Sequence, residues 1–140
     1  MTRPAPLETW HRIAATRDAG GLDALLADDV VFRSPAVHTP QQGKAITTAY
    51  LTAALHVLGP GLRYLDEWYA EDTDGQVGGS AVLEFESVVG DKTVHGVDML
   101  RWGAAGKLTS FTVMARPFKG LEALIAAMAV ELAEAQGVRG

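Results

Sequence analysis

The stretch AVLEFESVVGDKTVHGVDMLRW, residues 81–102, contains two long predicted strands and the turn between them. Apolar and polar residues alternate along both halves, which is typical of strands that bury one face. Gly-Asp at 90–91 suits a two-residue hairpin loop of type II′. With that loop, Leu83 on the first strand faces Asp98 on the second, so the register of the whole hairpin is predicted.

This register divides the side chains of the hairpin between two faces. Glu84, Glu86, His95 and Arg101 share the polar face, and Glu86 opposite His95 is interpreted as an exposed or interfacial charge pair. The other face is apolar except for one carboxyl group and must pack on helices; it comprises Leu83, Phe85, Val94, Gly96, Asp98 and Leu100.

Asp98 is therefore predicted to lie among apolar side chains. Desolvation disfavours a lone carboxylate, so we expect the pKa of Asp98 to lie above its ordinary value of about 3.9. Such a group can donate a hydrogen bond or carry a proton. The alternative is that Asp98 accepts hydrogen bonds from an indole, a hydroxyl or the backbone within a closed core.

The elements around the hairpin indicate an α+β fold, because helices precede a meander of strands. The predicted helices are residues 7–17, 22–27, a helix opened by a capping box at Thr39, Pro40 and Gln42 and running to 57, and 120–135. The predicted strands are residues 30–34, 62–71, 81–89, 93–102 and 108–116, with a flexible link at 72–79. We expect one domain over residues 1–140, frayed at about 1–5 and 136–140.

Composition excludes several classes of function. The 140 residues are 48% hydrophobic and 21% charged, carry a net charge of −5 and include no cysteine, which excludes disulfides, thiolate metal sites and a cysteine nucleophile. The 12 Lys and Arg are scattered, so nucleic acid and anionic membranes are not expected partners. The four His lack metal-ligand spacing, and the glycines form no phosphate loop. We therefore expect no metal and no cofactor, and a cytoplasmic protein, because no apolar leader is visible.

Two segments carry a resemblance to a known family. The run LLADDVVF at 25–32, which leads into Ser34-Pro35, and the run GVDMLRWGAAGKL at 96–108 resemble the SnoaL-like branch of the nuclear transport factor 2-like superfamily. The resemblance implies a strongly curved antiparallel sheet wrapped on the helices, forming a cone-shaped α+β barrel with a C-terminal helix and an apolar pocket. It also implies a homodimer built through the sheet. Members include ketosteroid isomerase, polyketide cyclases, limonene epoxide hydrolase and proteins without known catalysis, so fold alone does not settle function.

The resemblance also implies roles for individual residues. In ketosteroid isomerases the acid that matches Asp98 is held protonated and helps a tyrosine hold an enolate oxygen. The base position falls at Ser34 and the tyrosine position near Ile13, so steroid isomerisation by that mechanism is not expected. An epoxide hydrolase relay would need Asp66 and Arg116 beside Asp98, although Arg116 fits a surface or dimer-interface role better by strand alternation.

A cyclase needs only one acid or base. Asp98 supplies it, with His38, in the loop after the first strand, as a second catalytic candidate; alternatively, His38 caps the next helix or packs the loop. We predict a cofactor-independent proton-transfer enzyme, of isomerase, cyclase or hydrolase type, acting on a small apolar carbonyl or polyketide-like molecule. The alternatives are a non-catalytic binding protein and a dimeric interaction domain of the same fold. The predicted pocket residues are Tyr50, Trp68, Leu83, Phe85, Leu100, Phe111 and Val113.

Overall fold

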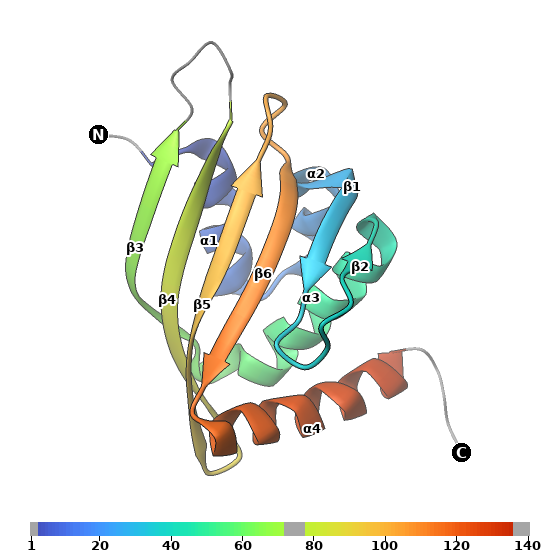
Figure 1. Cartoon of the computed structure of the whole chain (residues 1–140), viewed down its shortest axis with the longest axis vertical. Helices are drawn as coiled ribbons and strands as arrows, with labels where there is room; N and C mark the ends of the chain where they lie inside the picture. The colour runs from blue at the N-terminus through green and yellow to red at the C-terminus, as the bar shows by residue number, and fades with distance from the viewer. Residues whose placement is uncertain (1–2, 72–77, 136–140) are drawn as a thin grey trace.

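The computed structural model describes residues 3–71 and 78–135 (Figure 1). Its helices are α1 (Ala5–Thr16), α2 (Leu22–Leu25), α3 (Lys44–Leu58) and α4 (Phe118–Ala135), with 3₁₀ turns η1 (Ala19–Gly21) and η2 (Gly59–Gly61). Its strands are β1 (Leu26–Arg33), β2 (Gln41–Gln42), β3 (Arg63–Glu71), β4 (Gly79–Val89), β5 (Lys92–Trp102) and β6 (Leu108–Arg116). None of the described helices is long and apolar enough to cross a membrane.

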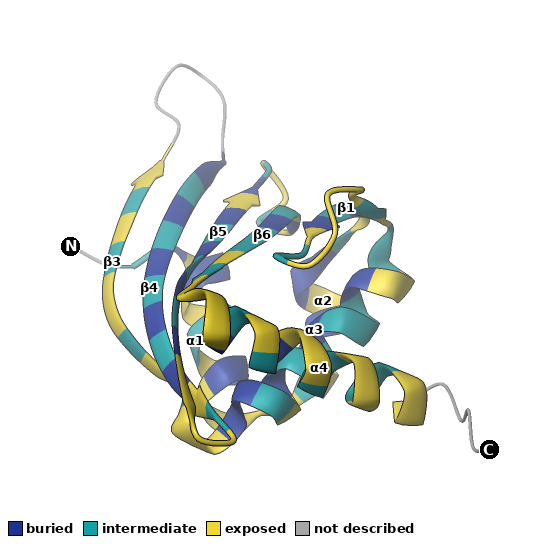
Figure 2. Ribbon diagram, turned by 60° about the horizontal axis from the view of Figure 1, so that its bottom comes forward, coloured by how far each residue is buried: buried dark blue, intermediate teal, exposed yellow. Residues whose placement is uncertain are grey.

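The strands form one curved sheet in the order β2-β1-β6-β5-β4-β3. Helices α1 and α3 lie against its concave side, and α4 runs across one end of the sheet (Figures 1 and 2). The predicted α+β class with a C-terminal helix is confirmed. The sheet is mixed, however, because β1 runs parallel to β6 while the other neighbours are antiparallel.

The predicted register of the β4–β5 hairpin is confirmed. Leu83 pairs with Asp98, and Glu86 pairs with His95. Burial alternates along both strands (Figure 2). Asp98 falls on the buried face of β5 and is only 6% exposed. The ion pair on the outer face differs from the expected one, because His95 Nε2 contacts Glu84 Oε2 at 2.7 Å while Glu86 pairs with Arg63.

Two predicted helix boundaries are wrong because strand pairing prevails over local helix signals. The helix predicted over 22–27 stops at Leu25, where the chain enters β1. The capping box at Thr39 does not form, because residues 41–42 pair with β1 as β2. Helix α3 begins only after Gly43, which adopts a φ of 105° and donates its N–H to the carbonyl of Val30 at 2.8 Å.

A β-bulge in β3 changes which side chains of that strand face inward. Tyr64 pairs with Phe85 and Asp66 pairs with Glu84, so Leu65 is an extra residue. An extra residue reverses the alternation beyond it. Trp68 consequently lies on the outer face, 55% exposed, and the prediction that it lines the pocket is wrong.

The N-terminal segment is fastened to β3. Arg3 Nε donates to Glu67 Oε2 at 2.8 Å, and His11 Nε2 lies 2.7 Å from Glu67 Oε1. Arg3 was expected in a frayed terminus, but this pairing orders it. Residues 72–77 of the link predicted at 72–79 and the predicted tail at 136–140 lie outside the described residues, whereas Gly79 already belongs to β4.

Candidate active site

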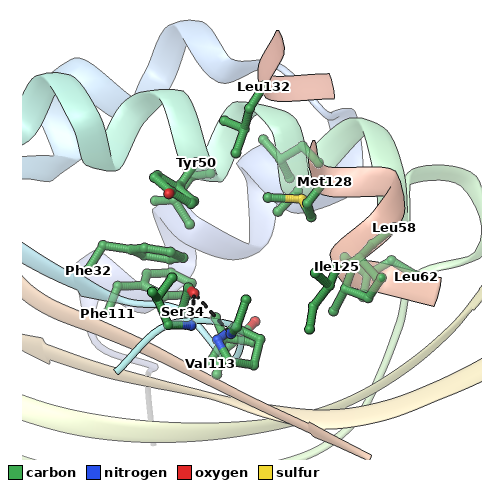
Figure 3. Close-up of a pocket in the computed structure, with 18 of the residues that line it drawn as sticks. Phe32, Ser34, Tyr50, Leu58, Leu62, Phe111, Val113, Ile125, Met128 and Leu132 are labelled. Carbon is green, nitrogen blue, oxygen red and sulfur yellow. Dashed lines mark hydrogen bonds between the residues drawn. The ribbon is translucent and has the colours of Figure 1, made fainter. Parts of the chain in front are cut away.

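A cavity of about 190 Å³ lies between the concave face of the sheet and helices α1, α3 and α4 (Figure 3). Its lining is almost wholly apolar. One wall is aromatic and includes Trp10, Phe32, Tyr50 and Phe111, and the other is aliphatic and includes Leu58, Leu62, Ile125, Met128 and Leu132. Ser34 and the three residues after it lie where β1 leaves the sheet and line the same cavity.

The aromatic wall is assembled from four different elements. The rings of Trp10 and Phe111 meet edge to face, with centroids 4.9 Å apart, and the rings of Phe32 and Tyr50 lie 5.2 Å apart. Phe32 and Phe111 come from the parallel strands β1 and β6 and are cross-strand partners. Aromatic pairs at these distances stabilise their own packing, so the wall is a preformed surface.

Asp98 is the acidic residue of this lining, and its carboxyl group ends a short chain of hydrogen bonds. The hydroxyl of Tyr64 donates to Asp98 Oδ2 at 2.6 Å. Trp10 Nε1 donates to the same Tyr64 oxygen at 2.9 Å. The Tyr64 oxygen thus accepts a hydrogen bond from Trp10 while its proton is donated to Asp98. Tyr64 therefore positions the carboxyl group and does not donate this proton to a ligand.

Burial has the largest effect on the pKa values of Asp98 and Tyr64. It raises the pKa of Asp98 to about 7, against a smaller lowering by the hydrogen bond from Tyr64. Burial, together with the negative charge of Asp98, raises the pKa of Tyr64 well above its ordinary value. Tyr64 therefore stays protonated near neutral pH, while Asp98 populates both its acid and its carboxylate forms.

Tyr64 is held in place from several sides. The ring of His11 meets it edge to face at 5.2 Å and that of Phe85 at 6.4 Å. Beside it, burial raises the pKa of Glu67, but the hydrogen bonds and charges of Arg3 and His11 lower it by more, so the net shift is downward. An ionised Glu67 thus fastens α1 to β3 next to the contact between Trp10 and Tyr64.

Replacing Tyr64 with Phe should raise the pKa of Asp98 further above its ordinary value, because the removed hydroxyl is the group that lowers it. The variant should also lose about 1–3 kcal/mol of stability, since the indole N–H of Trp10 loses its acceptor. NMR titration of the Asp98 carboxyl carbon and urea denaturation measure the two effects. Tyr50→Phe is the control, because Tyr50 lines the cavity without a hydrogen bond to Asp98. A midpoint that stays unchanged or falls in Tyr64→Phe contradicts the assignment.

The structure brings together only part of the predicted site. Asp98, Tyr50, Phe111 and Val113 line the cavity. The other predicted side chains on the concave face are fully buried in closed core and do not line the cavity; they are Leu83, Phe85 and Leu100. Leu83 and Leu100 belong to the core cluster that includes the buried face of α1, whereas Phe85 packs with Leu58, Leu124 and the ring of Tyr64. The expectation that they line the pocket is therefore wrong.

His38 does not lie with Asp98. It is exposed in the loop after β1 and lines a neighbouring hollow of about 490 Å³ that also contains Arg33 and Met114. This hollow is more open than the cavity and shares Ser34, Pro35, Val37 and Val113 with it. Ser34 borders both spaces, and its Oγ accepts the N–H groups of Ala36 and Val37 at 3.0 and 3.2 Å (Figure 3). These bonds leave the hydroxyl proton of Ser34 available as a donor.

The relay that an epoxide hydrolase would need is not assembled. Asp66 is exposed on the outer face, where it pairs with Glu84, and Arg116 lies there beside His95, with Nη1 3.3 Å from Nδ1. Both lie on the opposite face of the sheet from Asp98. Among residues 3–71 and 78–135, His, Asp and Glu side chains also form no group that could hold a metal ion.

Sequence reasoning missed Trp10 as a partner of the site. The two ends of the Trp10–Tyr64 hydrogen bond are 54 residues apart, and the spacing of Trp10 in its helix predicts only a buried position. The one signal was the polar atom of a buried indole, which needs an acceptor somewhere in the fold.

Comparison with solved structures identifies the family. A steroid delta-isomerase from Pseudomonas aeruginosa is 37% identical, with a TM-score of 0.84 over 96% of this chain and 93% of that one. The chain belongs to the nuclear transport factor 2-like superfamily. A second similar structure is a bacterial protein with a cystatin-like fold from Silicibacter pomeroyi, which is 27% identical, with a TM-score of 0.81 over 95% of this chain and 89% of that one.

Solved structures with lower sequence identity share only the fold with this protein. SalBIII, an epoxide hydrolase/cyclase-like enzyme of pyran ring formation in the polyether salinomycin, is 14% identical, with a TM-score of 0.62 over 82% of this chain and 90% of that one. No protein-family model and no curated protein matches the sequence. The neighbours therefore include isomerase and cyclase-like enzymes on one fold, which leaves the reaction to be argued from the site.

Proposed function

We propose that this protein is a cofactor-independent proton-transfer enzyme that acts on a small apolar carbonyl compound, with Asp98 as the group that carries the proton. The observation that supports this is a single carboxyl group, 6% exposed, in an otherwise apolar cavity, with a pKa of about 7. A general acid or base works best when its pKa lies near the working pH. The similarity to a protein named as a steroid delta-isomerase supports isomerase-type chemistry.

The proposed step uses both forms of Asp98. The carboxylate removes a proton from the carbon next to the substrate carbonyl, so that a C–H bond breaks, an O–H bond forms on Asp98 and the electron pair moves onto the carbonyl oxygen as an enolate. The protonated Asp98 then returns the proton to a carbon of the enolate. The hydroxyls of Ser34 and Tyr50, which line the same cavity, are the donors that would face the enolate oxygen.

Hydrogen exchange tests this function without knowledge of the natural substrate. In D₂O, 2-tetralone, a two-ring ketone with acidic C–H bonds, should gain deuterium next to its carbonyl faster with the protein than in buffer alone. The enhancement should rise with pH through about 7, as the carboxylate form of Asp98 becomes populated. Exchange is followed by proton NMR, and a rate equal to that in buffer at every pH rejects the proposal.

A non-catalytic binding protein is the second candidate. It is favoured by one observation: no Lys, Arg or His is among the described residues that line the cavity, so Asp98 has no second acid or base of that kind beside it. Binding of 2-tetralone without any acceleration of exchange would select this candidate. We do not place His38 in the reaction, because it lines a different space.

We also propose that the protein forms a homodimer through the outer face of the sheet. Trp68 and Met114 are each 55% exposed there, and the apolar residues Val82, Val97 and Met99 lie between them on neighbouring strands. Apolar side chains that adjoin one another on a surface mark interaction sites. The band is flanked by charge pairs of both signs, such as Glu84 with His95, which suits a surface that meets its own copy.

Replacing Trp68 with Glu should therefore convert a dimer into a monomer at micromolar concentration, because a carboxylate would be buried in the interface. Light scattering gives the mass of the wild type and of the variant. Val130→Glu is the matched control, because Val130 is 59% exposed on α4, away from the outer face of the sheet. A wild type of monomer mass, or a dimer that Trp68→Glu leaves intact, contradicts this interface.

A further inference from the structure

We infer that the cavity selects a neutral molecule of one or two rings whose carbonyl group lies beside Asp98, and that it does not enclose a four-ring skeleton. The inference rests on the proposed function only in placing the carbon next to that carbonyl at Asp98. Three features of the cavity carry it: its volume, the charge of its lining and the arrangement of its walls.

The volume limits the ligand to a small molecule. The cavity measures about 190 Å³. An apolar cavity of ~150 Å³ is enough to hold benzene. Pockets that bury drug-sized molecules are larger, at about 300–1,000 Å³. One ring fits, and a second fused ring can extend toward the neighbouring hollow that shares Ser34 and Val113 with the cavity. A four-ring molecule would have to leave much of its apolar surface in that open hollow, in contact with water.

The lining also excludes anions. No Lys, Arg or His is among the described residues around this cavity, and Asp98 itself adds negative charge whenever it is ionised. A carboxylate or phosphate on the ligand would lose its hydration without gaining a cation, which is strongly unfavourable in an apolar site. A neutral carbonyl oxygen, by contrast, needs no cation and can accept a hydrogen bond from the hydroxyl of Ser34 or Tyr50.

The two walls of the cavity differ in character. The ring of Phe32 lies 5.2 Å from that of Tyr50 at an angle of 31° and 6.1 Å from that of Phe111 at an angle of 36°, so the three rings stack at a tilt and form one packed aromatic side. Opposite them lie the aliphatic side chains of α4 and of the end of α3 (Figure 3). Met128, whose unbranched side chain adapts to irregular shapes, belongs to this second wall. A ring of the ligand between the walls contacts the packed aromatic side and an aliphatic side that can adapt to its shape.

Calorimetry with three probes tests the inference. We expect 2-tetralone to bind, and 2-naphthoate, an anion of the same ring size, to bind at least ten times more weakly at pH 8. Androst-4-ene-3,17-dione, a neutral four-ring ketone, should bind no more tightly than 2-tetralone, although it carries more apolar surface. Absence of 2-tetralone binding, equal binding of the anion, or clearly tighter binding of the four-ring ketone overturns the inference.

A pair of variants on one helix locates the ligand. Ala129 and Ala126 are both exposed on α4, but only Ala129 lines the cavity. Ala129→Phe should weaken 2-tetralone binding at least tenfold, and Ala126→Phe should leave it unchanged. Equal effects of the two variants would place the ligand elsewhere and overturn the inference. Failure of the proposed function would look different, since 2-tetralone would then bind with the predicted selectivity while its hydrogen exchange stayed at the rate in buffer.

Discussion

Replacing Asp98 with Asn should reduce the hydrogen exchange of 2-tetralone by about 10²- to 10⁴-fold, the contribution expected of a general acid or base. Asparagine matches the shape of aspartate and can still accept the hydrogen bond from Tyr64, but it does not carry a proton at any pH near neutrality. The fold should therefore persist while proton transfer is lost. Proton NMR in D₂O gives the rate, and circular dichroism checks the fold.

Asp66→Asn is the matched control for this variant. Asp66 lies on β3 as an exposed aspartate of the outer face, outside the cavity. Its replacement should leave the exchange rate unchanged. If Asp98→Asn retains the wild-type rate with its fold intact, Asp98 is not the proton carrier, and the proposed chemistry must be assigned to another group or abandoned.

The same variant should be more stable than the wild type at alkaline pH. The pKa of Asp98 is about 7 in the folded protein and about 3.9 in an unfolded chain. The folded state therefore binds this proton more tightly, and its contribution to stability is complete below pH 4 and is lost as the pH rises through about 7. The loss is on the order of 4 kcal/mol by pH 8, because each pKa unit corresponds to ~1.4 kcal/mol.

Urea denaturation of both proteins at pH 4 and pH 8 measures this effect. All other titrating groups are shared, so the difference in free energy of unfolding between wild type and Asp98→Asn isolates Asp98. That difference should shift in favour of the variant by a few kcal/mol between the two pH values. A difference that is the same at both would mean that Asp98 is not desolvated as the structure describes.

The position of Asp98 could be predicted because a local feature determines it. Gly90 and Asp91 fix the loop, the loop fixes the register, and the register places Asp98 on the buried face opposite Leu83. The same reasoning fails for Trp68. The bulge at Leu65 turns Trp68 to the outer face, and neither leucine nor tryptophan in a sequence indicates a bulge.

The rest of the site depends on how the helices lie over the sheet. The alternation of apolar and polar residues along a strand gives no information on that arrangement. Phe85 and Phe111 both face inward, but Phe85 is packed under the ring of Tyr64 while Phe111 borders open space. The bond between Trp10 and Tyr64 likewise joins segments 54 residues apart. His38 is a candidate by residue type, but the path of its loop places it in the neighbouring hollow and not among the residues that line the cavity with Asp98.

The state of Asp98 in the cavity is the central claim, and carbon-detected NMR tests it most directly. The carboxyl carbon of Asp98, assigned by comparison with Asp98→Asn, is followed from pH 3 to pH 10 in the protein without ligand. The structure predicts a single titration with its midpoint near 7. A midpoint at or below about 3.9, the ordinary value for aspartate, would contradict a desolvated proton carrier at this position.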